Sequence, residues 1–171
     1  MTRLFFAVLM AALSSTMLQA VEQPLAFGSV RFEENRGQTD SQVQYAARTR
    51  THQVFVTAKD VVFSPAAGPA IRMDFGGARP ARWRPAGEAV DSISYYIGKD
   101  PAKWVKGAPM FDRLVWRGAY PGIDVMLYSR GEKIEYDLVL APGADPSRVR
   151  LRFTGADRVD CDSSGAIEIG P

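Results

Sequence analysis

The chain has 171 residues, with 21 Lys and Arg against 19 Asp and Glu, one His and one Cys. This near-neutral balance lacks the basic footprint of a nucleic-acid-binding domain, so we expect no nucleic-acid partner. One cysteine excludes an internal disulfide, and together with one histidine it leaves too few ligands for a zinc site; we expect no cofactor.

The N-terminus is typical of a cleavable secretory signal peptide. Arg3 provides a basic start, residues 4–13 are an uninterrupted apolar run, and small and polar residues precede Ala20. The apolar run is shorter than the roughly 20 residues that a membrane-spanning helix needs. We therefore expect residues 1–20 to be a signal peptide, the secreted chain to begin at Val21, and no membrane association after cleavage.

Apolar residues alternate with polar ones along the rest of the chain, which predicts β-strands. In chain order the predicted strands are 29–33, 43–47, 53–57, 61–64, 71–75, 93–97, 111–116, 123–127, 133–140, 148–153, 159–162 and 166–169. Turn-forming residues at 58–60, 120–122 and 129–131 separate several of them. Many short strands at this spacing predict an all-β fold, an antiparallel β-sandwich or open barrel.

Two segments between the strands stand out. The Pro- and Gly-rich stretch 64–87 is expected to form mobile loops around its strand at 71–75, with Trp83 tethering a solvated loop. The segment Asp100 to Trp104 predicts one short helical turn, because Asp100 can cap the backbone and Pro101 suits the first helical position. We expect the Trp104 indole to pack into the core.

The last predicted strand comes directly before the C-terminus, where its outer edge needs a partner. After cleavage about 150 residues remain, enough for one domain with its own core. We predict a single β module over residues 21–171, truncated at its C-terminus as the N-terminal part of a longer protein.

Several segments carry a resemblance to a known family. They are 32–38 (FEENRGQ), 96–104 (YIGKDPAKW), 120–124 (YPGID), 135–146 (EYDLVLAPGADP) and 150–156 (RLRFTGA). In this order they resemble the N-terminal module of secreted bacterial SBBP-repeat proteins, whose repeats are predicted to form seven-bladed β-propellers. The resemblance covers nearly all of the mature chain. It implies a domain of unknown function without catalytic residues, whose partner is the downstream β-propeller repeats of the same longer chain.

Two groups of residues are candidates for binding. Glu34, Asn35, Arg36 and Gln38 form a dense polar cluster that either binds a sugar or peptide, or ties an N-terminal strand to the domain. Trp83 and Trp104 are candidates for an aromatic platform that stacks on sugars, although aromatic residues at alternating positions more often belong to a core.

Catalytic and metal-binding alternatives rest on few residues. Four carboxylates, Asp124, Glu135, Asp137 and Asp145, could bind Ca²⁺ or form an acid/base pair. The simpler interpretation places Glu135 and Asp137 on a solvated strand face opposite arginines such as Arg150 and Arg152. A hydrolase triad would depend on His52, without a Gly-x-Ser-x-Gly elbow in the sequence.

These observations lead to three ordered hypotheses. The first is a non-catalytic secreted β-sandwich module that acts as a cap, scaffold or interaction domain ahead of β-propeller repeats. The second is a carbohydrate- or cell-surface-binding domain with surface glycans or proteins as partners. The third is a glycosidase-like enzyme that uses paired carboxylates.

Overall fold

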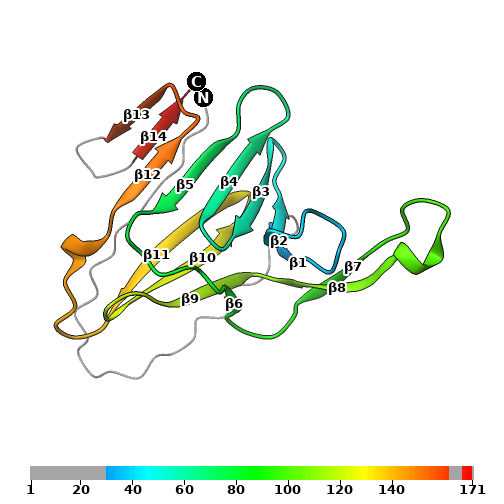
Figure 1. Ribbon diagram of the computed structural model, residues 1–171, viewed down its shortest axis with the longest axis horizontal. Helices are drawn as coiled ribbons and strands as arrows, with labels where there is room; N and C mark the ends of the chain where they lie inside the picture. Colours follow the sequence, from blue (N-terminus) through cyan, green and yellow to red (C-terminus); the bar gives the residue numbers. More distant parts are fainter. Residues whose placement is uncertain (1–29, 162–166, 171) are drawn as a thin grey trace.

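The computed structural model describes residues 30–161 and 167–170, so the predicted signal peptide lies outside the described residues. The described residues form antiparallel sheets of many short strands, which confirms the predicted all-β fold (Figure 1). The strands are β1 (Phe32–Glu34), β2 (Val43–Arg48), β3 (His52–Thr57), β4 (Asp60–Pro65), β5 (Ile71–Phe75), β6 (Arg84–Pro85), β7 (Asp91–Tyr95), β8 (Val105–Phe111), β9 (Arg113–Tyr120), β10 (Ile123–Arg130), β11 (Lys133–Leu140), β12 (Leu151–Thr154), β13 (Arg158–Cys161) and β14 (Ile167–Gly170).

The strands form two main sheets and one hairpin. The larger sheet has the order β12-β5-β4-β3-β2-β1-β8-β7, and the smaller sheet has the order β11-β10-β9-β6. The last two strands, β13 and β14, pair only with each other among the described residues.

The core lies between the two main sheets. Phe75 of β5 in the larger sheet meets two rings of the smaller sheet edge to face: Trp116 of β9 at 5.5 Å and Tyr136 of β11 at 5.9 Å. Ile123, Val125 and Leu127 alternate along β10 and are almost fully buried in the same cluster. The apolar side chains whose alternation predicted this strand therefore form the inner face of the smaller sheet, which packs against the larger one.

One extended segment joins the two sheets. β8 pairs with β1 and β7 in the larger sheet, and β9, which begins two residues after β8 ends, pairs with β6 and β10 in the smaller one. The sequence predicted a single strand at 111–116, which is wrong in its extent. Gly107 and Pro109 interrupt the apolar alternation of β8, and alternation does not show where a chain passes from one sheet to another.

The stretch 64–87 is more ordered than the loops we expected. Besides β5 it contains β6, whose Arg84 pairs with Val115 of β9. Ala81, just before this strand, is buried in the core, and its backbone N–H donates to the carbonyl of Ala58 at 2.7 Å. Trp83, the predicted tether, lies in this segment and is buried as well.

The predicted strand 148–153 is partly wrong. Pro146–Arg148 form a short 3-10 helix (η2) that Asp145 caps, and strand pairing begins at Leu151. β12 pairs with β5 in the larger sheet, so Arg152 faces Asp74, at 4.0 Å, rather than the carboxylates of β11. The predicted pairing of Arg150 and Arg152 with Glu135 and Asp137 is therefore wrong, because the two strands belong to different sheets.

The hairpin of β7 and β8 projects from the body of the sandwich, at the right of Figure 1. We call this hairpin, with its connecting loop, the arm. The loop holds a second 3-10 helix, η1 (Pro101–Lys103), which Asp100 caps by accepting the backbone N–H of Ala102 at 3.0 Å. This confirms the helical turn predicted there. Within residues 30–161 and 167–170, no helix is long and apolar enough to cross a membrane.

Candidate functional site

The predicted polar cluster is brought together in the connection between β1 and β2, where its side chains bond to the loop itself. The Asn35 amide nitrogen donates to the carbonyls of Asp40 and Val43, both at 2.8 Å, and its oxygen accepts from the backbone N–H of Gly37 at 3.0 Å. The Gln38 amide donates to the carbonyl of Glu34 at 2.8 Å. These contacts fix the loop, which favours the structural alternative for the cluster.

The two tryptophans of the predicted aromatic platform lie in different environments. Trp83 is only 3% exposed, its ring centroid is 5.5 Å from that of Trp116, and its indole N–H donates to the carbonyl of Thr57 at 3.1 Å. Its backbone N–H also donates to the Gln44 side chain at 3.0 Å. Trp83 therefore tethers its segment as a core residue and offers no face for a ligand.

Trp104 lies at the tip of the arm, so the prediction that its indole packs into the core is wrong. Its ring meets Tyr96 edge to face at a centroid distance of 5.3 Å, and its N–H donates to the carbonyl of Gly98 at 3.2 Å. Trp104 remains half-buried through these local contacts. The cap at Asp100 was correctly predicted, but a local turn does not determine whether its tryptophan meets the core.

Three of the four candidate carboxylates lie on adjacent strands, Asp124 on β10 and Glu135 and Asp137 on β11, while Asp145 lies just before η2. Asp124 accepts from the Arg117 side chain at 3.0 Å and from the backbone N–H of Gly118 at 2.7 Å. Asp145 caps η2, and hydrogen bonds from Ser147 lower the pKa of its carboxyl. In the part of the chain that the structure describes, no three His, Cys, Asp or Glu side chains come together in a group that could hold a metal ion.

Glu135 and Asp137 share the outer face of β11 and contact side chains of β10. Glu135 lies 3.7 Å from the Arg130 guanidinium, and Asp137 accepts a hydrogen bond from the Tyr128 hydroxyl at 3.2 Å. Burial, and then the charge of Asp137, raises the pKa of Tyr128. The two carboxylates therefore belong to a cross-strand polar network of β10 and β11.

His52, the one histidine of the sequence, begins β3 in a local polar setting. Its Nδ1 lies within hydrogen-bond distance of the hydroxyls of Thr49 (3.1 Å) and Thr51 (2.9 Å), and its ring packs against Phe63 at 5.9 Å. Burial lowers the pKa of the imidazole below its ordinary 6.5.

This lowered pKa predicts a pH dependence of stability. The unfolded chain binds a proton at His52 near its ordinary pKa, while the folded chain resists it, so folding stability is lost as the pH falls through 6.5 towards the folded pKa. NMR titration of the single imidazole should give a pKa below 6.5. In the His52→Gln variant, we expect the denaturation midpoint to change less with pH over this range. An imidazole pKa at its ordinary value would contradict the burial of His52.

At the root of the arm lies a buried carboxylate that the sequence did not indicate. Glu33 of β1 is 3% exposed, and it accepts a hydrogen bond from the Tyr95 hydroxyl at the end of β7. Arg48 of β2 completes the group: its guanidinium donates to the Tyr95 oxygen at 3.0 Å, lies 3.7 Å from Glu33 and stands over the Tyr95 ring at 5.7 Å. Burial, and then the bond to Glu33, raises the pKa of Tyr95.

This group fastens the arm to the body of the domain. Glu33 follows the buried Phe32 in an alternating strand, so the sequence pattern places it on the solvent face. Tyr95 from a distant strand and Arg48 of β2 both contact it there. A buried carboxylate is stable in such a place when it is paired and hydrogen-bonded, as Glu33 is here.

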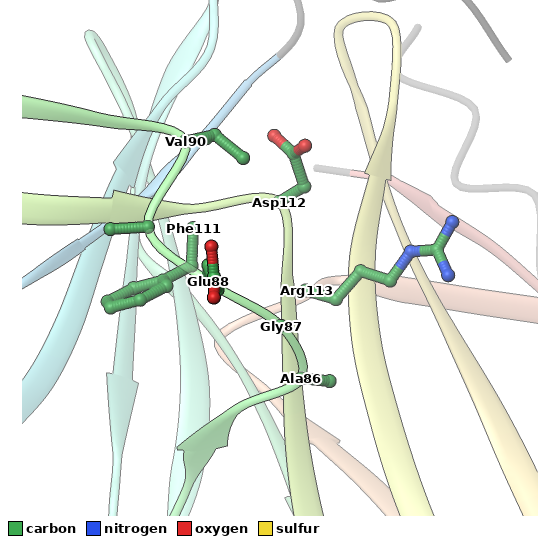
Figure 2. A pocket seen from close by; sticks show the side chains of 8 residues that line it. Ala86, Gly87, Glu88, Val90, Phe111, Asp112 and Arg113 are labelled. Carbon is green, nitrogen blue, oxygen red and sulfur yellow. The ribbon is translucent and has the colours of Figure 1, made fainter. Parts of the chain in front are cut away.

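A pocket of about 420 Å³ lies beside the passage from β8 to β9. Its walls are Ala86, Gly87, Glu88, Ala89, Val90, Phe111, Asp112 and Arg113. Figure 2 shows the Arg113 guanidinium extending away from Glu88 and Phe111, with Asp112 on a third side. Ligand sites gather a few polar groups on one point, whereas the charged groups here diverge.

Comparison with known proteins gives one family. A model described as a domain of unknown function (DUF7948) matches residues 32–170. Neither the curated proteins nor the solved structures contain a significant match.

Proposed function

The chain belongs to the DUF7948 family of domains of unknown function, and from this premise we propose that it is a non-catalytic, secreted β-sandwich module that caps the β-propeller repeats of a longer chain. The resemblance to SBBP-repeat proteins suggests these repeats as its partner. The signal-like N-terminus supports export of the module. The internal bonds of Asn35 and Gln38 in the polar cluster support a structural rather than a catalytic role for it.

The observation that carries this proposal is the hairpin of β13 and β14. Its strands pair from Arg158↔Gly170 to Cys161↔Ile167, and neither outer edge pairs with another described strand. Val159 on β13 is 48% exposed. An unpaired edge offers backbone N–H and C=O groups to a further strand, so the hairpin is suited to continue into a following sheet.

The test compares the secreted chain with one that continues into the following repeats. We expect the longer chain to melt at a higher temperature and to form less dimer or aggregate, because its next strands cover the edges of β13 and β14. Scanning calorimetry and light scattering on both chains measure this. Equal stability and an already monomeric shorter chain would contradict the capping role.

A second function, binding to a cell surface, is favoured by the arm. The arm leaves the sandwich on the side away from β13 and β14 in Figure 1. The arm and the β13/β14 hairpin can therefore contact different partners at the same time. Its tip carries the exposed side chains Tyr96 and Ile97. The sugar-platform form of this hypothesis loses support because Trp83 is buried.

The third hypothesis, a glycosidase, receives less support. Its two carboxylates would have to flank the bound sugar. Glu135 and Asp137 instead project from one face of a single strand, where Arg130 and Tyr128 engage them.

A further inference from the structure

The tip of the arm concentrates exposed apolar surface. Tyr96 and Ile97 are 62% and 67% exposed, more than any other large apolar side chain of residues 30–160. They are adjacent in the chain, and Tyr96 contacts the half-buried Trp104 across the loop. Scattered single apolar residues on a surface need no explanation, but a cluster at a projecting point indicates an interaction site.

Local bonds hold this tip in shape without help from the core. Asp100 caps η1, the backbone N–H of Trp104 donates to the carbonyl of Pro101 at 3.2 Å, and the Trp104 indole donates to Gly98. An ordered tip loses little conformational entropy on binding. The tip is therefore pre-formed for contact.

The charge around these apolar residues is positive. Lys99, Lys103 and Lys106 are all exposed, and none of them forms an ion pair with a described residue. The only acidic residue in the loop, Asp100, is engaged in capping η1. The three lysines outnumber this one carboxylate, so the tip offers an excess of positive charge to its partner.

We propose that the arm tip binds an anionic lipid bilayer, with Tyr96 and Ile97 entering the headgroup region and the three lysines meeting lipid phosphates. Aromatic and aliphatic side chains beside basic residues are the combination that holds proteins at the surface of anionic membranes. This inference rests on the cell-surface function proposed above. It replaces the expectation, based on the absence of a spanning segment, that the mature chain has no membrane partner.

The shape of the tip favours a bilayer over a sugar. A sugar ring stacks on an open aromatic face, whereas Tyr96 and Trp104 meet edge to face at 85° and use part of that surface on each other. The Trp104 N–H is also occupied by Gly98. A projecting tip enters a deformable headgroup layer without needing a complementary groove.

The test measures binding of the secreted chain to vesicles of phosphatidylcholine with and without phosphatidylglycerol. We expect sedimentation with the anionic vesicles, weakened by added salt because exposed charges are screened. Tyr96→Ser combined with Ile97→Ser should lower the partition coefficient by roughly tenfold or more. Lys99→Gln and Lys103→Gln should each lower it by about fivefold.

Fluorescence adds a readout specific to the tip. Trp83 and Trp116 are buried and Trp104 is not, so lipids with a brominated acyl chain should quench Trp104 selectively on binding. Val139→Ser, an exposed apolar position on β11, and Lys59→Gln, an exposed position between β3 and β4, serve as matched controls. Both should bind as the unaltered chain does.

Three results would overturn the proposal. They are no sedimentation with anionic vesicles, equal binding by the Tyr96 and Ile97 double variant, and binding that does not respond to vesicle charge. Tip-dependent attachment to cells that protease treatment of the cells abolishes, without vesicle binding, would assign the tip to a protein partner instead. None of these results alters the stability comparison between shorter and longer chains, so a failure here is separable from a failure of the capping role.

Discussion

Replacing Trp83 with alanine is expected to lower the free energy of unfolding by about 3–5 kcal/mol, the range for truncating a buried large aromatic side chain. The indole is 3% exposed, packs against Trp116 and donates to the carbonyl of Thr57. Its removal leaves a cavity in the core and takes away the hydrogen bond to the Thr57 carbonyl. Chemical denaturation followed by circular dichroism measures the loss.

Trp104→Ala is the matched control for this change. The same side chain is removed, but at the tip of the arm its ring contacts are with Tyr96 rather than with the core. We expect a loss of about 1 kcal/mol or less, as for surface substitutions. A loss as large as that of Trp83→Ala would place Trp104 in the core and contradict the arm as an exposed element.

Replacing Gly155 with alanine is expected to cost about 3 kcal/mol or more, because two penalties combine. Gly155 has a φ of +81°, a left-handed conformation that costs other residues roughly 1–2 kcal/mol. A Cβ atom at this position would also lie 2.2 Å from the carbonyl oxygen of Ala70. The backbone between β12 and β13 therefore approaches the start of β5 too closely for a side chain.

Gly77→Ala separates the two penalties. Gly77 has nearly the same φ, +77°, but a Cβ atom there meets nothing within 4 Å. Its substitution should cost only the conformational part, roughly 1–2 kcal/mol. If both alanine variants lose the same free energy of unfolding, the close approach of residue 155 to Ala70 is wrong.

The alternation of apolar and polar residues predicted the strands that bury one face against the core. The boundaries of β5 and β11 match the predicted ranges 71–75 and 133–140 because each strand alternates buried and solvent-facing residues along its length. The turn at Pro121 and Gly122 was also correct, since these residues favour a tight turn whatever surrounds them.

Contacts between residues far apart in the sequence determined the features that the alternation of apolar and polar residues did not predict. β8 contains Gly107 and Pro109, which weaken its strand signal, and it forms because β1 and β7 pair with it. Trp83 and Trp104 have the same chemistry and similar Pro- and Gly-rich surroundings, yet only the first meets the opposite sheet. The buried carboxylate of Glu33 accepts a hydrogen bond from Tyr95, a residue 62 positions away.

The most direct test of the two proposed roles is amide hydrogen exchange on the chain alone and on a chain continued into the proposed β-propeller repeats, each with and without phosphatidylglycerol vesicles. We predict slower exchange at 158–170 only in the longer chain, and slower exchange at 96–107 only when vesicles are present. The sandwich strands between these ends should exchange alike in all four samples. Vesicle protection confined to the 34–38 loop or the pocket at 86–90, with both ends unchanged, would contradict the account.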